Sequence, residues 1–348
     1  MCELFEFVML NFHQLVRLPQ AEINRLDVAI LNLASASGLP GADRIDWKRN
    51  LSKLDEWAGR CKRFTDGMMP HFHRGRCDYP NSEPKFRIQA MITHLQRDIG
   101  IRFHPNRKRD EDIFQPEDSF VYGVVQGEGG TCGNLPIVYA AIGRRMGYPL
   151  KLVSTRCHGF CRWDDGTLLG ERFNIEASGE GVSFFEDEHY RSGSYSMPSE
   201  TVRICGYLQS YSPREEVASF ISQRGECWVQ EKNYREATHS FVWAHELDPR
   251  RHQYTFQLQQ AIQNWNEAIQ SRLPSREQLP KLTIDLPPRQ FRYLPHEVER
   301  DIIGLTVMEH LMNDVKSSRR WWEPMRMNPN LRPADLPQLL RAEYSWDS

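Results

Sequence analysis

The chain has 348 residues, of which 40% are hydrophobic and 26% charged, a composition typical of a folded globular protein. Its 44 basic and 46 acidic residues give a formal net charge of -2, so we expect no surface that binds nucleic acid. No run approaches the roughly 18 apolar residues of a membrane span. Glu3 and Glu6 stand where a signal peptide would carry Lys or Arg. We therefore expect a cytoplasmic protein that binds neither membranes nor nucleic acid, and its eight scattered cysteines fit a reducing compartment.

The first 110 residues are expected to form a helical lead-in. Apolar residues at helical spacing predict two helices within Gln20–Ala58. A third helix is predicted over Lys85–Ile99, ended by Gly100. Residues 102–119 are polar and charged, which indicates an ordered surface loop.

Residues 111–210 are expected to form an α+β unit. A glycine loop precedes a predicted helix over Cys132–Met146, and Gly147 stands where a C-terminal cap belongs. Strands are predicted over 150–154, 159–163 and 172–177, with a tight turn at Asp164-Asp165-Gly166. A helix followed by antiparallel strands is typical of the α+β class.

Residues 211–271 have the spacing of a tetratricopeptide repeat, in Gly225, Trp228, Ala237, Phe241, Ala244 and Pro249. We expect helices near 213–231, 234–246 and 252–271. One repeat cannot form a solenoid, so the extension is expected to pack on the α+β unit, where it could also bind a protein partner.

Residues 272–348 are expected to form a proline-rich linker, a helix over His296–Lys316 and a tail. The tail carries Trp321 and Trp322, which we expect to hold it against the body of the protein.

The most informative motif is Gly127-Glu128-Gly129-Gly130-Thr131-Cys132 at the start of the predicted helix. The glycines allow the backbone to approach a substrate closely. The partial positive charge of a helix N-terminus favours thiolate over thiol. We therefore interpret Cys132 as a nucleophile whose own backbone N–H is an oxyanion donor.

Residues that could assist this thiol follow in order along the chain. His158, the only histidine between Cys132 and Asn174, is the expected base. Strand alternation places Asn174 and Glu176 on one face, so we expect Asn174 to orient the histidine and Glu176 to support it. Gln126 is a further candidate for stabilising an oxyanion.

Two other interpretations of the cysteines are open. Cys157, His158 and Cys161 form a C-H-x-x-C cluster, and His71, His73 and Cys77 form a looser one, but neither has a matching pair at zinc-site spacing. We expect neither a metal nor a cofactor. Alternatively, Cys132 could be a redox sensor with Cys157 or Cys161 as its resolving thiol.

Four blocks together resemble the transglutaminase-like superfamily, and most closely its SirB-type bacterial branch: 130–132, 144–153, 158–163 and 173–176. Residues 32–41 and 54–58 resemble the helical lead-in of that branch, and the resemblance covers about residues 20–250. It implies a papain-like fold and a triad of Cys132, His158 and Asn174, where the superfamily usually has Asp as the third member. The chemistry it implies is thiol-dependent acyl transfer or hydrolysis at amide bonds.

The sequence thus predicts an enzyme of this class acting on a protein or peptide. The alternative is an inactive transglutaminase-like scaffold that binds a partner through its helical extension. Placing the Cys132 sulfur beside His158 in an open cleft would favour the enzyme, and separating them would favour the scaffold.

Overall fold

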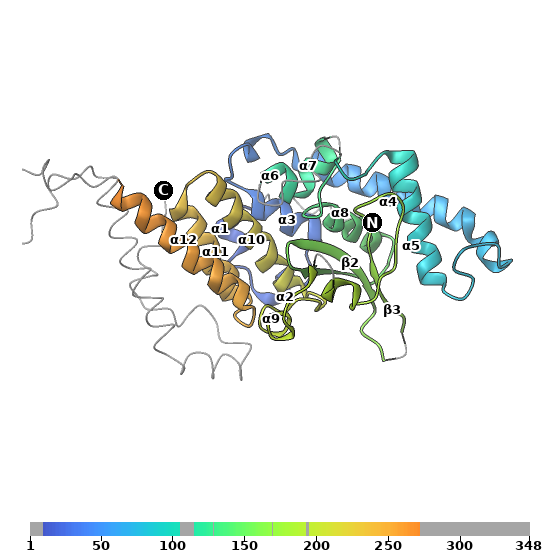
Figure 1. The fold of residues 1–348 in the computed structure, drawn as a ribbon. Helices are drawn as coiled ribbons and strands as arrows, with labels where there is room; N and C mark the ends of the chain where they lie inside the picture. The colour runs from blue at the N-terminus through green and yellow to red at the C-terminus, as the bar shows by residue number, and fades with distance from the viewer. Residues whose placement is uncertain (1–9, 105–114, 128, 169, 193–194, 272–348) are drawn as a thin grey trace, which may run out of the picture.

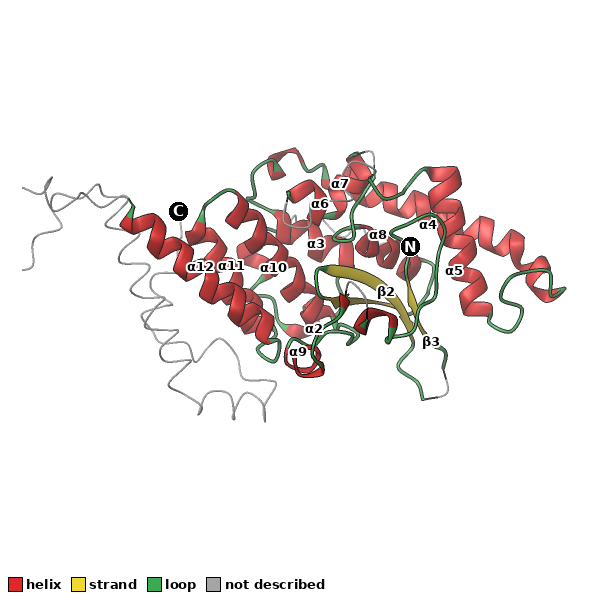
Figure 2. Cartoon of the chain, in the orientation of Figure 1, coloured by secondary structure: helices red, strands yellow, loops and turns green. Residues whose placement is uncertain are grey.

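The fold is that of a computed structural model, which describes residues 10–104, 115–127, 129–168, 170–192 and 195–271 (Figure 1). It combines many helices with one small antiparallel sheet, so the protein is α+β (Figure 2). None of the helices in the described ranges is long and apolar enough to cross a membrane. The expected linker, last helix and tail beyond residue 271 lie outside the described residues.

The lead-in is helical, as predicted, but its helices differ in length from the expectation. The region Gln20–Ala58 contains the short α2 (Gln20–Ile23), α3 (Val28–Ala36) and the beginning of α4 (Trp47–His73), which continues well beyond it with Pro70 in its last turn. Asp27 and Asp46 cap these two helices by accepting hydrogen bonds from backbone N–H groups. The elements before the sheet are α1 (Phe12–Leu15), α2 (Gln20–Ile23), α3 (Val28–Ala36), η1 (Ala42–Arg44), α4 (Trp47–His73), α5 (Glu83–Thr93), η2 (His94–Ile99), α6 (Pro116–Ser119) and α7 (Val121–Gln126).

The third predicted helix is confirmed as α5, which continues into the π-helical turn η2. Gly100 ends this segment with φ +88°, a backbone conformation that suits glycine. The loop expected over 102–119 is partly wrong, because Pro116–Ser119 forms the short helix α6. Proline is favoured in a first helical turn, where its missing N–H costs nothing.

The helix that follows Cys132, α8 (Leu135–Arg145), lies at the centre of the fold. All of its residues from Leu135 to Gly143 are buried. The side chain of Asn134 closes the loop before it by accepting a hydrogen bond from the Thr131 N–H at 2.8 Å. Cys132 therefore lies just ahead of a rigid, buried helix.

The sheet contains β1 (Leu150–Thr155), β2 (His158–Asp164) and β3 (Arg172–Ile175), in that order and all antiparallel. Thr155 pairs with His158, so Arg156 and Cys157 form a two-residue turn. The predicted turn after β2 is longer than expected, since the connection to β3 runs from residue 165 to 171. One face of the sheet packs on α8 through Leu150, Leu152 and Cys161, and the other packs on Tyr190 and Leu208.

The predicted C-terminal helices are confirmed as α10 (Pro213–Gln230), α11 (Tyr234–Leu247) and α12 (His252–Gln270), preceded by the short α9 (Ser199–Ile204). They lie side by side at one end of the molecule, and α4 and α5 lie at the other (Figure 1). Gly225 allows α10 and α11 to approach closely, because a Cβ there would lie 2.5 Å from the Phe241 ring.

Candidate active site

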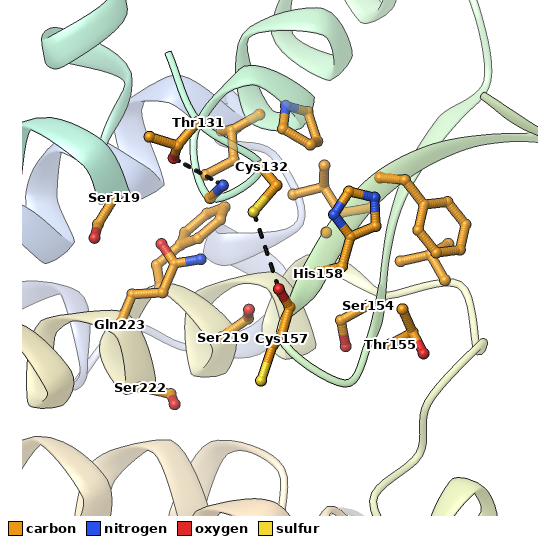
Figure 3. Close-up of a pocket in the computed structure, with 18 of the residues that line it drawn as sticks. Ser119, Thr131, Cys132, Ser154, Thr155, Cys157, His158, Ser219, Ser222 and Gln223 are labelled. Carbon is orange, nitrogen blue, oxygen red and sulfur yellow. Dashed lines mark hydrogen bonds between the residues drawn. The ribbon is translucent and has the colours of Figure 1, made fainter. Parts of the chain in front are cut away.

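Cys132 and His158 line one cavity of about 710 Å³ (Figure 3). Its walls come from the loop before α8, the β1–β2 hairpin, the segment before α7, and helices α10 and α12. The structure therefore brings the predicted nucleophile and base together in an accessible site. This is the arrangement that the sequence analysis required of an enzyme.

The Cys132 loop is held by hydrogen bonds on both sides of the sulfur. The Thr131 hydroxyl donates to the Asp118 carbonyl at 2.6 Å and accepts from the Gly133 N–H at 3.0 Å. Gly159 on β2 allows the loop to pass, because a Cβ there would lie 2.9 Å from the Cys132 carbonyl oxygen. Among the described residues, the Cys132 N–H has no acceptor. This donor is therefore available to a ligand oxygen.

His158 has a carboxylate partner. Its Nε2 lies 2.6 Å from Glu176 Oε2, and the two side chains are 8% and 16% exposed. The other Glu176 oxygen, Oε1, accepts from the Ser178 N–H at 3.1 Å and from the Ser178 hydroxyl. The Tyr190 hydroxyl donates to Oε2 at 3.2 Å. Because Nε2 is occupied, Nδ1 is the ring nitrogen left for Cys132, which lies beside the imidazole (Figure 3).

The surroundings of His158 favour its protonated form. Burial alone would lower the His158 pKa, but hydrogen bonds to Cys132 and Glu176, and the charge of Glu176, raise that pKa to about 9. Burial would likewise raise the pKa of Glu176, but its hydrogen bonds and the charge of His158 lower that pKa overall. Both shifts favour the pair in which His158 is an imidazolium and Glu176 a carboxylate.

Asn174 does not contact His158, which corrects its expected place as the orienting residue. It occupies a second polar cluster on the same face of the sheet, where its Oδ1 accepts from Arg162 Nε at 2.6 Å. Its amide donates to Asp187 Oδ1 at 2.8 Å, and Arg162 donates to the same oxygen at 2.6 Å.

The sheet register explains why Glu176, rather than Asn174, contacts His158. Arg162 pairs with Asn174, so Asn174 lies four residues along β2 from His158, about 13 Å at the rise of a strand. Glu176 lies two residues further along the chain and therefore nearer to His158. The prediction that residues 174 and 176 share a face is confirmed, but only the second reaches the histidine.

Gln126 does not line the cavity. It is the last residue of α7 and is exposed, so its predicted contact with an oxyanion is wrong. Gln115 and Gln223 line the cavity instead. Gln223 comes from α10, almost 100 residues after Cys132. The signal that could have revealed it is the run of polar residues at helical spacing on α10: Ser219, Ser222, Gln223 and Glu226.

The cysteines proposed as resolving thiols do not face Cys132. Its sulfur lies 4.0 Å from the carbonyl oxygen of Cys157, whose own sulfur points away from it (Figure 3). The Cys161 thiol is buried and donates to the Pro136 carbonyl at 3.0 Å. Within the part of the chain that the structure describes, no group of three or more His, Cys, Asp and Glu residues is arranged to hold a metal ion.

Comparison with known proteins identifies no relative of this chain. No family model matches the chain, and neither a curated protein nor a solved structure gives a match.

Proposed function

We propose that this protein is a transglutaminase-like, thiol-dependent enzyme that cleaves or transfers acyl groups at amide bonds of a protein or peptide. The observation that carries the proposal is that His158, which lines one cavity with Cys132, contacts Glu176 through its Nε2. A thiol, an imidazole and a carboxylate in this order supply a nucleophile, a proton carrier and a group that orients the carrier. The resemblance implies a papain-like fold with a carboxylate as the third member of the triad. We propose that Glu176 provides this carboxylate.

The first half of the reaction forms a thioester. The Cys132 sulfur attacks the amide carbonyl carbon, and the carbonyl electron pair moves to the oxygen. We propose the Cys132 N–H, which has no acceptor among the described residues, as the donor to this oxyanion. His158 gives its proton to the leaving amine as the C–N bond breaks, which leaves an acyl group on sulfur and a neutral imidazole.

The second half releases the acyl group. The neutral imidazole of His158 takes a proton from water as the water oxygen attacks the thioester carbon. The C–S bond then breaks, and the thiolate and imidazolium return. An amine in place of this water would give acyl transfer, and we propose hydrolysis as the default outcome. Glu176 keeps the ring oriented in both halves.

Selective alkylation tests the proposed nucleophile. Iodoacetamide at pH 6, followed by peptide mass spectrometry, should modify Cys132 at least about tenfold faster than Cys77 or Cys157, because a histidine hydrogen-bonded to the sulfur activates it as a nucleophile. Four other thiols are buried, at Cys61, Cys161, Cys205 and Cys227. His158→Gln should remove the selectivity and provides the control. Equal rates at Cys132, Cys77 and Cys157 in the unaltered protein would contradict the proposal.

The scaffold alternative predicts a different outcome of the same assay. A non-catalytic scaffold does not need an activated thiol, so Cys132 would react as an ordinary cysteine. A partner that binds through α10–α12 is compatible with either function. The geometry favours the enzyme, because the sulfur and the imidazole face each other in a cavity rather than in a closed core.

A further inference from the structure

One wall of the cavity comes from α10 and α12 rather than from the sheet and α8. Ser219, Gln223 and Glu226 follow one another at intervals of four and three residues, so they lie on one face of α10. Gln253 and Gln257 of α12 line the same cavity. Figure 3 shows the Gln223 amide directed toward the Cys132 loop. A ligand that reaches Cys132 can therefore contact this wall.

Glu226 is a carboxylate without a counterion. Its Oε1 accepts from Gln257 Nε2 at 2.7 Å, and Gln257 is in turn held by the Ser222 hydroxyl at 2.9 Å. No Lys or Arg among the described residues forms an ion pair with it. Burial raises the pKa of Glu226, and no positive charge acts against this. Burial therefore favours the neutral carboxyl, and a cation bound beside Glu226 would stabilise its charged form.

Gln223 lacks a partner as well. Its Oε1 is buried and accepts no hydrogen bond from any described residue. A buried acceptor without a donor is costly, and a ligand N–H would remove that cost. Glu226 and Gln223, on one face of α10, could therefore both accept hydrogen bonds from a ligand.

The rest of the cavity lining also favours a positively charged ligand. Its lining includes the acidic residues Asp118 and Glu226 but neither Lys nor Arg. Among the residues that the structure describes, the only basic group in the lining is that of the proposed catalytic residue His158. An anionic ligand would find no cation on this wall, whereas a cationic ligand would complete it.

We propose that the wall formed by α10 and α12 binds an ammonium or guanidinium group of the substrate through Glu226 and Gln223. This proposal rests on the proposed function of Cys132, and it gives the substrate class: amides of molecules that carry a cationic nitrogen group. Its geometry requires that group to lie on the α10 side of the reacting carbonyl. Glu226 supplies the charge, and Gln223 supplies a second, neutral acceptor.

Electrophiles of matched size test the charge preference. N-alkyl chloroacetamides with tails of two to six carbons, ending in ammonium, guanidinium, hydroxyl or carboxylate, react as the Cys132 sulfur bonds to the methylene carbon and chloride leaves. At the best tail length, either cation should react about tenfold faster than the hydroxyl compound. Comparing the rates of the ammonium and guanidinium compounds shows which of the two cations the site prefers. Each rate is divided by the iodoacetamide rate of the same variant.

Matched variants locate the preference. Glu226→Gln should bring the ratio of cation to hydroxyl rates to about one, and Gln223→Leu should reduce it. Glu231→Gln removes an exposed charge just after α10, so it should keep the ratio of the unaltered protein. No cation preference at any tail length, or a preference that survives Glu226→Gln, would overturn the proposal.

A binding measurement separates this proposal from the chemistry of Cys132. In a Cys132→Ala protein, calorimetric titration should show tighter binding of 1-aminopentane than of 1-pentanol, and Glu226→Gln should abolish the difference. Equal binding of the two compounds would overturn the cation site even if Cys132 is reactive. A clear difference would support the cation site even if Cys132 fails the alkylation test.

Discussion

At the scale of single residues, Glu176 is held by donors other than His158. Ser178 binds one carboxylate oxygen and Tyr190 binds the other, so the carboxylate cannot turn away from the ring. The histidine is in turn fixed in one orientation. A fixed imidazole can present Nδ1 to sulfur without losing side-chain entropy during the reaction.

Replacing Glu176 and Asn174 separately tests which of the two orients His158. Glu176→Gln should slow Cys132 alkylation at pH 8 about tenfold. Loss of a nearby opposite charge typically lowers a pKa by about 1–3 units, which would bring the His158 pKa down from about 9 and leave little imidazolium at that pH. Asn174→Ala should leave this rate unchanged. It should instead lower the free energy of unfolding by about 1–3 kcal/mol, since Arg162 and Asp187 lose a buried partner. A slower reaction in Asn174→Ala alone would restore Asn174 as the orienting residue.

The His158 pKa also predicts how stability depends on pH. The pKa is about 9 in the folded protein against 6.5 for the unperturbed side chain, so the folded state binds the proton more tightly. This contribution is complete below about pH 6.5 and is lost as pH rises through about 9. It amounts to about 3 kcal/mol, at about 1.4 kcal/mol for each unit.

Urea unfolding of the protein and of His158→Gln at pH 6 and at pH 9.5 measures this contribution. The difference in unfolding free energy between the two proteins should fall by about 3 kcal/mol between these pH values. The subtraction removes the titration of shared groups that do not interact with His158. A difference that stays constant with pH would show that the His158 pKa is not raised.

At the scale of elements, hydrophobic periodicity predicted the long helices well. The three C-terminal helices begin and end within about two residues of their predicted limits. For α10 and α11 the sequence carries an N-cap, Ser212 and Asn233, beside the apolar positions. Short elements were harder to predict. The helix α6 has only four residues, and its backbone depends on contacts with α7 and α10 rather than on its own periodicity.

Two glycine substitutions should have opposite effects on stability. Gly225→Ala should lower the free energy of unfolding by about 1–3 kcal/mol, because its Cβ would overlap the Phe241 ring between α10 and α11. Gly67→Ala in α4 is the control: no atom lies within 4 Å of its added Cβ, and alanine is the better helix former. This variant should gain about 0.5–1 kcal/mol. Thermal or urea unfolding measures both, and stabilisation by Gly225→Ala would contradict the observed packing.

At the scale of the whole molecule, α10 ties the C-terminal helices to the α+β unit. Glu216 on α10 is fully buried and forms a two-fold ion pair with Arg144 of α8, with one bond at 3.0 Å. Arg224 of the same helix donates to the carbonyls of Ser35 and Ser37, at 3.1 Å and 2.5 Å. The wall of the cavity is therefore fixed relative to Cys132.

Breaking the buried ion pair should weaken the whole described fold. Glu216→Ala should lower the free energy of unfolding by about 3–5 kcal/mol, because it leaves the partly buried Arg144 charge without a partner. The exposed pair Glu200–Arg203 offers the control, since Glu200→Ala should cost less than about 1 kcal/mol. Circular dichroism and tryptophan fluorescence should report one shared transition. Separate transitions would mean that α10–α12 unfold independently.

The sequence by itself predicted Cys132 and His158 as a candidate pair, and it predicted where the main helices run. Those properties depend on residue type and on local periodicity, such as glycines before Cys132 and apolar spacing in α8 and α10. The tertiary structure alone decided that Glu176, not Asn174, meets His158, and that α10 and α12 complete the cavity. The first depends on the register between β2 and β3, and the second on packing between residues about 90 or more positions apart. Neither leaves a local pattern in the chain, because such contacts are chosen by how all the elements pack together.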